Sequence, residues 1–131
     1  MSAQITCAAP FLIVRDLPAS IAFYRDLLGF DVTFSAPETA PFFAVIQRGG
    51  AMVMLKEVDA DPEPNPTRDP EARWDIFFSA PDPSSLAAEY SDAGVAFRTP
   101  VGETHDGLVG FELADPDGHV LFFGSPVGGG Q

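Results

Sequence analysis

Apolar positions in the first half of the chain follow two periods. An apolar run ends at Val14, as in a strand entering a turn. Pro18 suits the first turn of a helix, and apolar residues then recur at helical spacing until Gly29, which favours helix termination. Gly49-Gly50 separates two further apolar runs. The pattern predicts strands at 6–14, 30–34, 42–48 and 51–57, with a helix at 18–28 after the first.

The second half repeats this order of elements. Pro18 and Gly29 recur as Pro83 and Gly94, 65 residues further on in both cases. Asp115-Pro-Asp-Gly118 has the signature of a type I turn before the last strand. Equal spacing in two consecutive segments indicates an internal repeat. The expected strands are 73–79, 95–98, 108–114 and 119–124, with a helix at 83–93.

These elements predict an α+β fold with two tandem βαβββ modules that form a curved mixed sheet with a concave cleft. The 131 residues fit one domain, with modules at about 6–57 and 73–124. Proline and acidic residues fill 58–72, which is therefore expected to be an exposed linker. Residues 125–131 are expected to form a flexible tail, since glycine occupies positions 128 to 130.

Charge and cysteine content narrow the partners. Nineteen acidic and seven basic side chains give a net charge of −12, which disfavours nucleic acid and anionic membranes. The charge either serves solubility alone or also attracts a cationic ligand. One cysteine, Cys7, and the absence of a signal-peptide pattern predict a cytoplasmic protein. No apolar stretch approaches the roughly 18 residues of a membrane span.

Two motifs resemble a known superfamily. The segment Val14 to Phe30 reads VRDLPASIAFYRDLLGF, and Asp115 to His119 reads DPDGH. Together with the duplicated βαβββ unit, they are similar to the glyoxalase, bleomycin resistance and extradiol dioxygenase superfamily, also called vicinal oxygen chelate proteins. The resemblance spans about residues 6 to 124 and implies the corresponding fold. One scaffold can host unrelated activities, so function needs separate evidence.

Enzymes of this superfamily hold a divalent metal with one residue on the first and last strand of each module. Carried onto this chain, the four positions fall on Ala9, Met54, Asp75 and Phe122. Only Asp75 offers a suitable ligand atom, and one carboxylate does not hold an ion against water. His105 and His119 are expected to point away from the cleft. We therefore expect no metal and no other cofactor.

Strand alternation then selects a ligand-binding wall. If the four positions face the cleft, residues at even spacing from them face it too. The expected ligand-binding residues are Phe11, Met52, Met54, Lys56, Asp75, Phe77 and Phe122. The alternate residues, Trp74 among them, are expected in the core. Asp75 would pair with Lys56 or Arg73, await a cationic ligand, or act as a general base.

The resemblance is greatest to the bleomycin-resistance branch, whose members lack the metal and form homodimers. It implies a metal-free protein that binds a small cationic or aromatic molecule and sequesters an antibiotic-like compound. No residue is expected to be catalytic under this hypothesis. The alternative is a metal-dependent lyase or dioxygenase with a non-standard metal site. A third possibility is a dimeric partner module whose cleft is filled by its own side chains.

Overall fold

A computed structural model describes residues 3–128 of the chain. The chain divides into two compact units, Met1–Pro62 and Glu63–Gln131, and the two are considered one at a time. Each unit contains one βαβββ module with its own four-stranded mixed sheet. The predicted α+β class and the duplicated module are thus confirmed. No helix among the described residues is long and apolar enough to cross a membrane.

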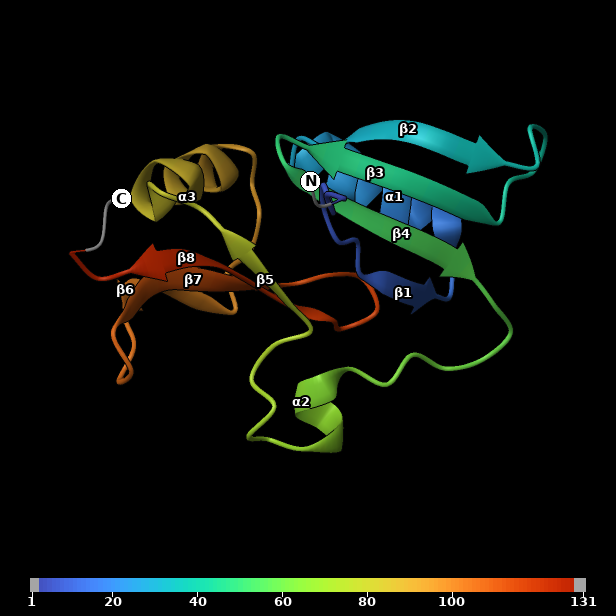
Figure 1. Cartoon of the computed structure of the whole chain (residues 1–131). Helices are drawn as coiled ribbons and strands as arrows, with labels where there is room; N and C mark the ends of the chain where they lie inside the picture. Colours follow the sequence, from blue (N-terminus) through green and yellow to red (C-terminus); the bar gives the residue numbers. More distant parts are fainter. Residues whose placement is uncertain (1–2, 129–131) are drawn as a thin grey trace. The chain divides into compact units, whose positions relative to one another are not determined.

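The first unit has the strand order β1-β4-β3-β2, in which β1 is parallel to β4 and the other pairs are antiparallel (Figure 1). Parallel pairing needs a long crossover connection, and here the chain supplies it with a helix and two further strands. Its elements are β1 (Phe11–Val14), α1 (Leu17–Ala22), the π-helix η1 (Phe23–Leu27), β2 (Asp31–Ala36), β3 (Phe43–Arg48) and β4 (Ala51–Glu57).

The second unit has the matching order β5-β8-β7-β6, again with its first and last strands parallel. It begins with the short helix α2, which interrupts the segment expected to be an exposed linker. Its elements are α2 (Asn65–Arg68), β5 (Ile76–Ser79), α3 (Pro83–Asp92), β6 (Thr99–Glu103), β7 (Leu108–Ala114) and β8 (Val120–Pro126).

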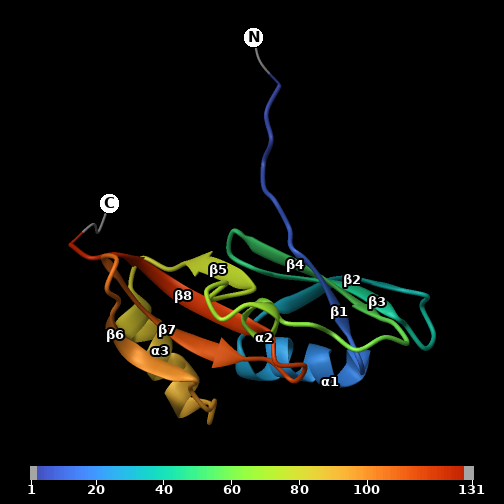
Figure 2. The same cartoon turned by 90° about the horizontal axis from the view of Figure 1, so that it is seen from below.

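The core of each unit lies between its sheet and one helix (Figures 1 and 2). Alternate strand residues point to this side, as the sequence pattern predicts. In the first unit Tyr24 and Leu28 are fully buried with Val53 and Leu55 of β4. In the second unit Tyr90 of α3 makes edge contacts with the rings of Phe111 and Phe123. The opposite face of each sheet carries no helix of its own unit.

The helix starts of the two modules are 66 residues apart. Asp16 caps α1 by accepting a hydrogen bond from the amide three residues on, at 3.1 Å, and Asp82 caps α3 in the same way. Pro18 is therefore the second residue of its helix, whereas Pro83 is the first. Pairing the two prolines, as the sequence suggests, is one residue out of register.

The glycines that follow the helices, Gly29 and Gly94, are only 65 residues apart, so the first helical segment holds one extra residue. The π-helix η1 accommodates it, with the Leu28 amide bonded to the Phe23 carbonyl at 3.2 Å. A turn closed between residues five apart takes one residue more than an α-helical turn. The two modules thus regain the same strand arrangement after the helix.

Three predicted strand boundaries are corrected by the structure. The expected strand at 95–98 is wrong, because the Val95 amide still bonds to the Tyr90 carbonyl and β6 begins only at Thr99. The first strands of the two modules begin at Phe11 and Ile76, later than expected. At the other end, β8 continues to Pro126, into the expected tail, and residues 129–131 lie outside the described residues.

Candidate ligand-binding site

Three aromatic rings form a stack on the helix-free face of the second sheet. Phe77 of β5 lies opposite Phe122 of β8, with their ring centroids 5.4 Å apart. Trp74, just before β5, stacks on Phe122 at 4.7 Å and contacts Phe77 at 5.4 Å. Phe122 is only 2% exposed, whereas Phe77 is 42% exposed. We call Trp74, Phe77 and Phe122 the aromatic stack.

Two glycines allow Phe122 to lie flat against the sheet. Gly110 of β7 and Gly124 of β8 are register partners. A Cβ added at Gly110 would lie 2.6 Å from Cζ of Phe122 and 2.3 Å from the carbonyl oxygen of Phe123. A Cβ at Gly124 would lie 2.5 Å from Cε2 of the same ring. Both distances are below any van der Waals contact, so only glycine leaves room for this ring.

The polar edge of the indole is bonded to an acid on the same face. Trp74 Nε1 donates to Oε2 of Glu112 on β7, at 3.1 Å. The other carboxylate oxygen of Glu112 accepts from Arg98 and, at 3.0 Å, from the Thr99 hydroxyl. A partly buried indole N–H normally finds such an acceptor. These bonds fix the orientation of the ring.

A cation covers the outer side of the indole. The Arg73 guanidinium carbon lies 4.3 Å from the centroid of the Trp74 ring. Its Nη1 donates to Oδ2 of Asp106, in the β6–β7 turn, at 2.7 Å. The Thr104 hydroxyl bonds to the other oxygen of Asp106 at 2.5 Å. The Thr104 bond and, next, the Arg73 bond lower the pKa of Asp106 to about 2, so it is ionised at neutral pH.

The carboxylate of Asp75 is bonded to two backbone amides. Its Oδ1 accepts from the Asn65 amide at the start of α2, and its Oδ2 accepts from the Val120 amide at the start of β8, both at 2.8 Å. The side chain therefore ties the segment before β5 to the sheet. The expected pairing with Lys56 or Arg73 is wrong for this residue, because backbone donors satisfy both of its oxygens.

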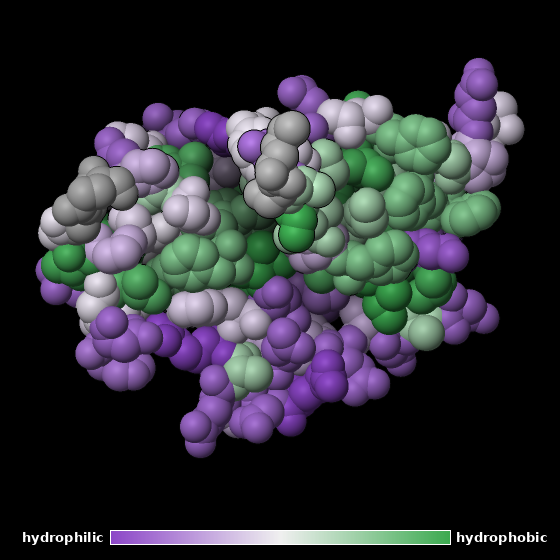
Figure 3. Space-filling model, viewed as in Figure 1, coloured by the Kyte–Doolittle hydropathy of each residue, from purple (hydrophilic) through white to green (hydrophobic). Residues whose placement is uncertain are grey.

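The first sheet carries a different surface on its helix-free side. Phe11 lies opposite Met54, which pairs with Val45, which in turn pairs with Phe34. The Phe43 ring contacts both Phe11 and Phe34, with centroids 6.2 Å apart in each case. We call these five residues the apolar face, and Figure 3 shows it as a hydrophobic area. Phe11 and Phe34 are both 55% exposed.

The remaining predicted residues of the first unit lie on the same strand, β4. Met52 and Met54 are half-buried and point to the helix-free side, as alternation predicts. Lys56 is also half-buried, and its Nζ lies 5.8 Å from the centroid of the Phe42 ring. Each unit thus brings its own share of the predicted residues onto one face of its sheet.

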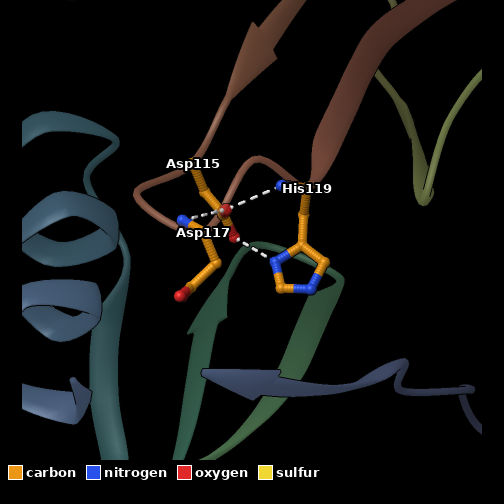
Figure 4. Close-up of side chains that lie close together, drawn as sticks. All are labelled: Asp115, Asp117 and His119. Atoms are coloured by element: carbon orange, nitrogen blue, oxygen red, sulfur yellow. Dashed lines mark hydrogen bonds and ion pairs between the residues drawn. The ribbon is translucent and has the colours of Figure 1, made fainter. Parts of the chain in front are cut away.

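One group of metal-ligand side chains occurs among the described residues. Asp115, Asp117 and His119 place ligand atoms within 4.8 Å of one another. Oδ1 of Asp115 accepts from the amides of Asp117 and His119 at 2.9 Å, and its Oδ2 bonds to His119 Nδ1 at 2.8 Å (Figure 4). These bonds close the β7–β8 turn around the Asp115 carboxylate. The arrangement is that of a turn cap, which uses the atoms a metal would need.

Burial and charge act in opposite directions on His119, which is 4% exposed. Burial lowers the pKa of His119, but the hydrogen bond and charge of Asp115, helped by the charges of Asp75 and Asp117, outweigh it. The net result is a pKa above the ordinary value of 6.5.

Comparison with known families and structures places this geometry. The Glyoxalase/Bleomycin resistance protein/Dioxygenase superfamily matches residues 4–123. The chain belongs to this superfamily. Comparison with curated protein sequences gives no significant match.

Solved structures of superfamily type have the same fold. A bleomycin-binding protein from bleomycin-producing Streptomyces verticillus, solved with copper(II)-bleomycin, is 26% identical over 93% of this chain and 97% of its own, with a TM-score of 0.70. TioX from Micromonospora sp. ML1 is 18% identical, covering 91% and 98%, also with a TM-score of 0.70. A glyoxalase / bleomycin resistance protein from Catenulispora acidiphila is 23% identical, covering 92% and 97%, with a TM-score of 0.68.

The side chains of this superfamily member do not fit the metal that its enzymes use. Met54 lies on the apolar face, and Phe122 is enclosed in the aromatic stack. Both oxygens of Asp75 accept backbone hydrogen bonds. Ala9 has no donor atom in its side chain. The four expected positions therefore supply hydrophobic contacts and one structural carboxylate.

Sequence reasoning missed the polar half of this superfamily member's second face. Trp74 was expected in the core, but β5 begins at Ile76, so strand alternation does not extend back to residue 74. Glu112 carried a signal, because it is the one acid within the apolar run of β7. Such an acid needs a donor nearby. Asp106 gave no comparable signal, since it lies in a polar turn.

Proposed function

We propose that this protein binds a small, flat, partly apolar molecule at the aromatic stack and holds it without chemical change. The observation that carries the proposal is the stack itself: one buried ring supports two others, and the outermost phenylalanine is 42% exposed. Rigid rings with a few fixed polar groups are typical of small-molecule sites. Phe77 gives a ligand its ring contact, while Glu112 and Asp106 flank the indole with carboxylates.

A cationic ligand is favoured by charge. The chain carries a net charge of −12, which raises the local concentration of small cations. The similarity to a protein solved with copper(II)-bleomycin, at 26% identity, supports an antibiotic-like ligand. We therefore propose sequestration of such a compound, with resistance as its consequence. Metal independence is part of this proposal, and it is supported by the poor ligand chemistry of the four superfamily positions.

The experiment is a calorimetric titration of the protein with metal-free bleomycin and with other planar cationic compounds, in the presence of a chelator. We expect saturable binding at about one site per chain. Phe77→Ala should weaken binding by about tenfold, because an exposed ring contact is lost. Phe42→Ala is the matched control, since Phe42 belongs to the first unit and is 49% exposed. It should leave the affinity unchanged.

Two results would count against the proposal. The first is a panel of planar cations that gives no heat of binding and no thermal shift. The second is an equal loss of affinity in both phenylalanine variants, which would move the site away from the stack. Elemental analysis of the purified protein tests metal independence separately, and a transition metal at about one per chain would contradict it.

A cytoplasmic homodimer remains a prediction within the same proposal. The apolar face of the first unit supports self-association, because exposed apolar clusters of this kind commonly mark interaction surfaces. Light scattering after size-exclusion chromatography measures the mass directly. Phe34→Glu on the apolar face should shift a dimer towards the monomer, whereas Ile5→Glu, at a position 93% exposed, should not.

A further inference from the structure

Neither face of the Trp74 indole is open. One face stacks on Phe122, with an angle of 27° between the ring planes. The Arg73 guanidinium lies 4.3 Å from the ring centroid, and it must be on the other face because Phe122 occupies the first. A flat ligand can therefore reach the indole face only where Arg73 now lies.

Arg73 is held in that place by contacts that are easily exchanged. Its side chain is 31% exposed, and the side chain of its partner Asp106 is 43% exposed. Ion pairs this exposed contribute little net stability. Arg73 also precedes β5 and takes no part in the strand ladder, so its side chain can leave the indole without breaking a sheet hydrogen bond.

We propose that Arg73 is a built-in competitor for the ligand at Trp74. The guanidinium is a planar, delocalised cation that lies on an indole and donates an N–H to a carboxylate. The ligand class that reproduces all three contacts is a planar, delocalised cation with an N–H group, such as an amidinium or guanidinium attached to a ring. Such a ligand displaces Arg73, stacks on the indole, and donates to Asp106. This inference rests on the proposed function and specifies its ligand class.

Competition of this kind lowers the apparent affinity, since only the fraction of molecules with Arg73 displaced can bind. Trp74 is the only tryptophan in the chain, so its fluorescence reports on this position alone. The probe is benzamidine, a ring bearing an amidinium, and the neutral comparison is benzamide. Arg73→Ala should tighten benzamidine binding by about three- to tenfold, the range expected for an exposed to partly buried cation–π contact.

Arg25→Ala is the matched control. Arg25 also pairs with a neighbouring acid, Asp26, at the surface of the first unit, and its removal changes the net charge by the same amount. It should leave benzamidine binding unchanged. A second readout needs no ligand: quenching of Trp74 by acrylamide should be faster in Arg73→Ala than in the unmodified protein and in Arg25→Ala.

The double variant Arg73→Ala with Asp106→Asn tests the carboxylate. It should lose most of the gain for benzamidine while keeping the faster acrylamide quenching, because the indole stays open but the anionic partner is gone. Benzamide should gain less than benzamidine from Arg73→Ala. Equal gains for the two probes would remove Asp106 from the inference.

The inference is overturned if Arg73→Ala weakens benzamidine binding, which would make Arg73 part of the binding surface, or if it changes neither affinity nor quenching. Failure of the proposed function looks different. A protein that binds no antibiotic-like compound, yet gains benzamidine affinity on loss of Arg73, keeps the competitor and loses only the sequestration hypothesis.

Discussion

The two units carry one framework with two different faces. In the first sheet a row of register partners runs Phe11, Met54, Val45 and Phe34 across the four strands. In the second sheet the equivalent row runs Phe77, Phe122, Glu112 and Thr99. The first row is apolar throughout, whereas the second is aromatic on one half and polar on the other. Duplication preserved the strand order and left the helix-free faces to diverge.

The neighbouring positions explain how the second face became a stack. The first sheet places Phe43 opposite Lys56, and both side chains stand on the face. The second sheet has Gly110 opposite Gly124 at the equivalent pair. Removing two side chains leaves a shallow space that the Phe122 ring fills, and Trp74 then covers that ring. A pocket-like environment arises here from missing atoms, with no change in the backbone order.

The largest difference between the rows should appear on truncation. Phe122→Ala removes a ring that is 2% exposed and supports Trp74, and we expect a loss of about 4 kcal/mol in the free energy of unfolding. Met54→Ala, the equivalent change in the first sheet, removes a half-buried side chain and should cost about 2 kcal/mol. Urea unfolding measures both. Equal losses would mean that the stack does not support the second unit.

The glycine pair gives the next largest effect. Gly110→Ala should destabilise the protein by about 3 kcal/mol, because the new methyl group meets both the backbone and the Phe122 ring. Gly102→Ala is the control in the same sheet, since its nearest neighbour would be 3.9 Å away. Thermal unfolding of the two variants separates close approach from ordinary loss of glycine. Similar melting temperatures would contradict the close contact.

The turns between the last two strands also differ. The first module uses Gly49-Gly50, whereas the second builds its turn around buried Asp115 and His119. Removing the bond to Asp115 by His119→Gln should cost about 2 kcal/mol at pH 6, the range for a hydrogen bond to a charged group. Because the folded state raises the pKa of His119, its charge-dependent stabilisation is complete below pH 6.5 and is lost as the pH rises through the folded-state pKa.

The measurement is urea unfolding of the unmodified protein and of His119→Gln at pH 6 and pH 9. The difference between the two proteins should be larger at pH 6. His105→Gln, at the exposed β6–β7 turn, is the control and should show no such trend. A difference that stays constant with pH would contradict an ionised His119 in the folded state.

The smallest effect separates two serines that the sequence repeat seems to pair. Ser20 is 1% exposed, and its hydroxyl has no hydrogen-bond partner within the described chain, whereas the Ser85 hydroxyl bonds to Asp82 at 2.7 Å. Ser20→Ala should raise stability by about 1 kcal/mol, since an unsatisfied buried hydroxyl is removed. Ser85→Ala should lower it by about 0.5 kcal/mol. Chemical unfolding curves with the same sign for both would contradict this distinction.

By itself the sequence determined the two modules and their cores. Strand alternation and helical spacing depend on neighbouring residues, and glycine and proline mark the ends of the elements, so this information is local. Val14, Val53, Leu55 and Leu121 lie in the cores as the pattern predicted. The poor metal-ligand chemistry of the four superfamily positions could also be read directly from residue types.

Only the tertiary structure decided what the second face contains. Trp74 meets Glu112 across 38 residues, and Arg73 meets Asp106 across 33, in segments that lack a repeating pattern. The helix register also needed the structure, because a π-helical turn absorbs one residue without leaving a mark in the spacing of Pro18 and Gly29. Local periodicity places a residue on an element, but its distant partners depend on how the strands pair and where each strand begins.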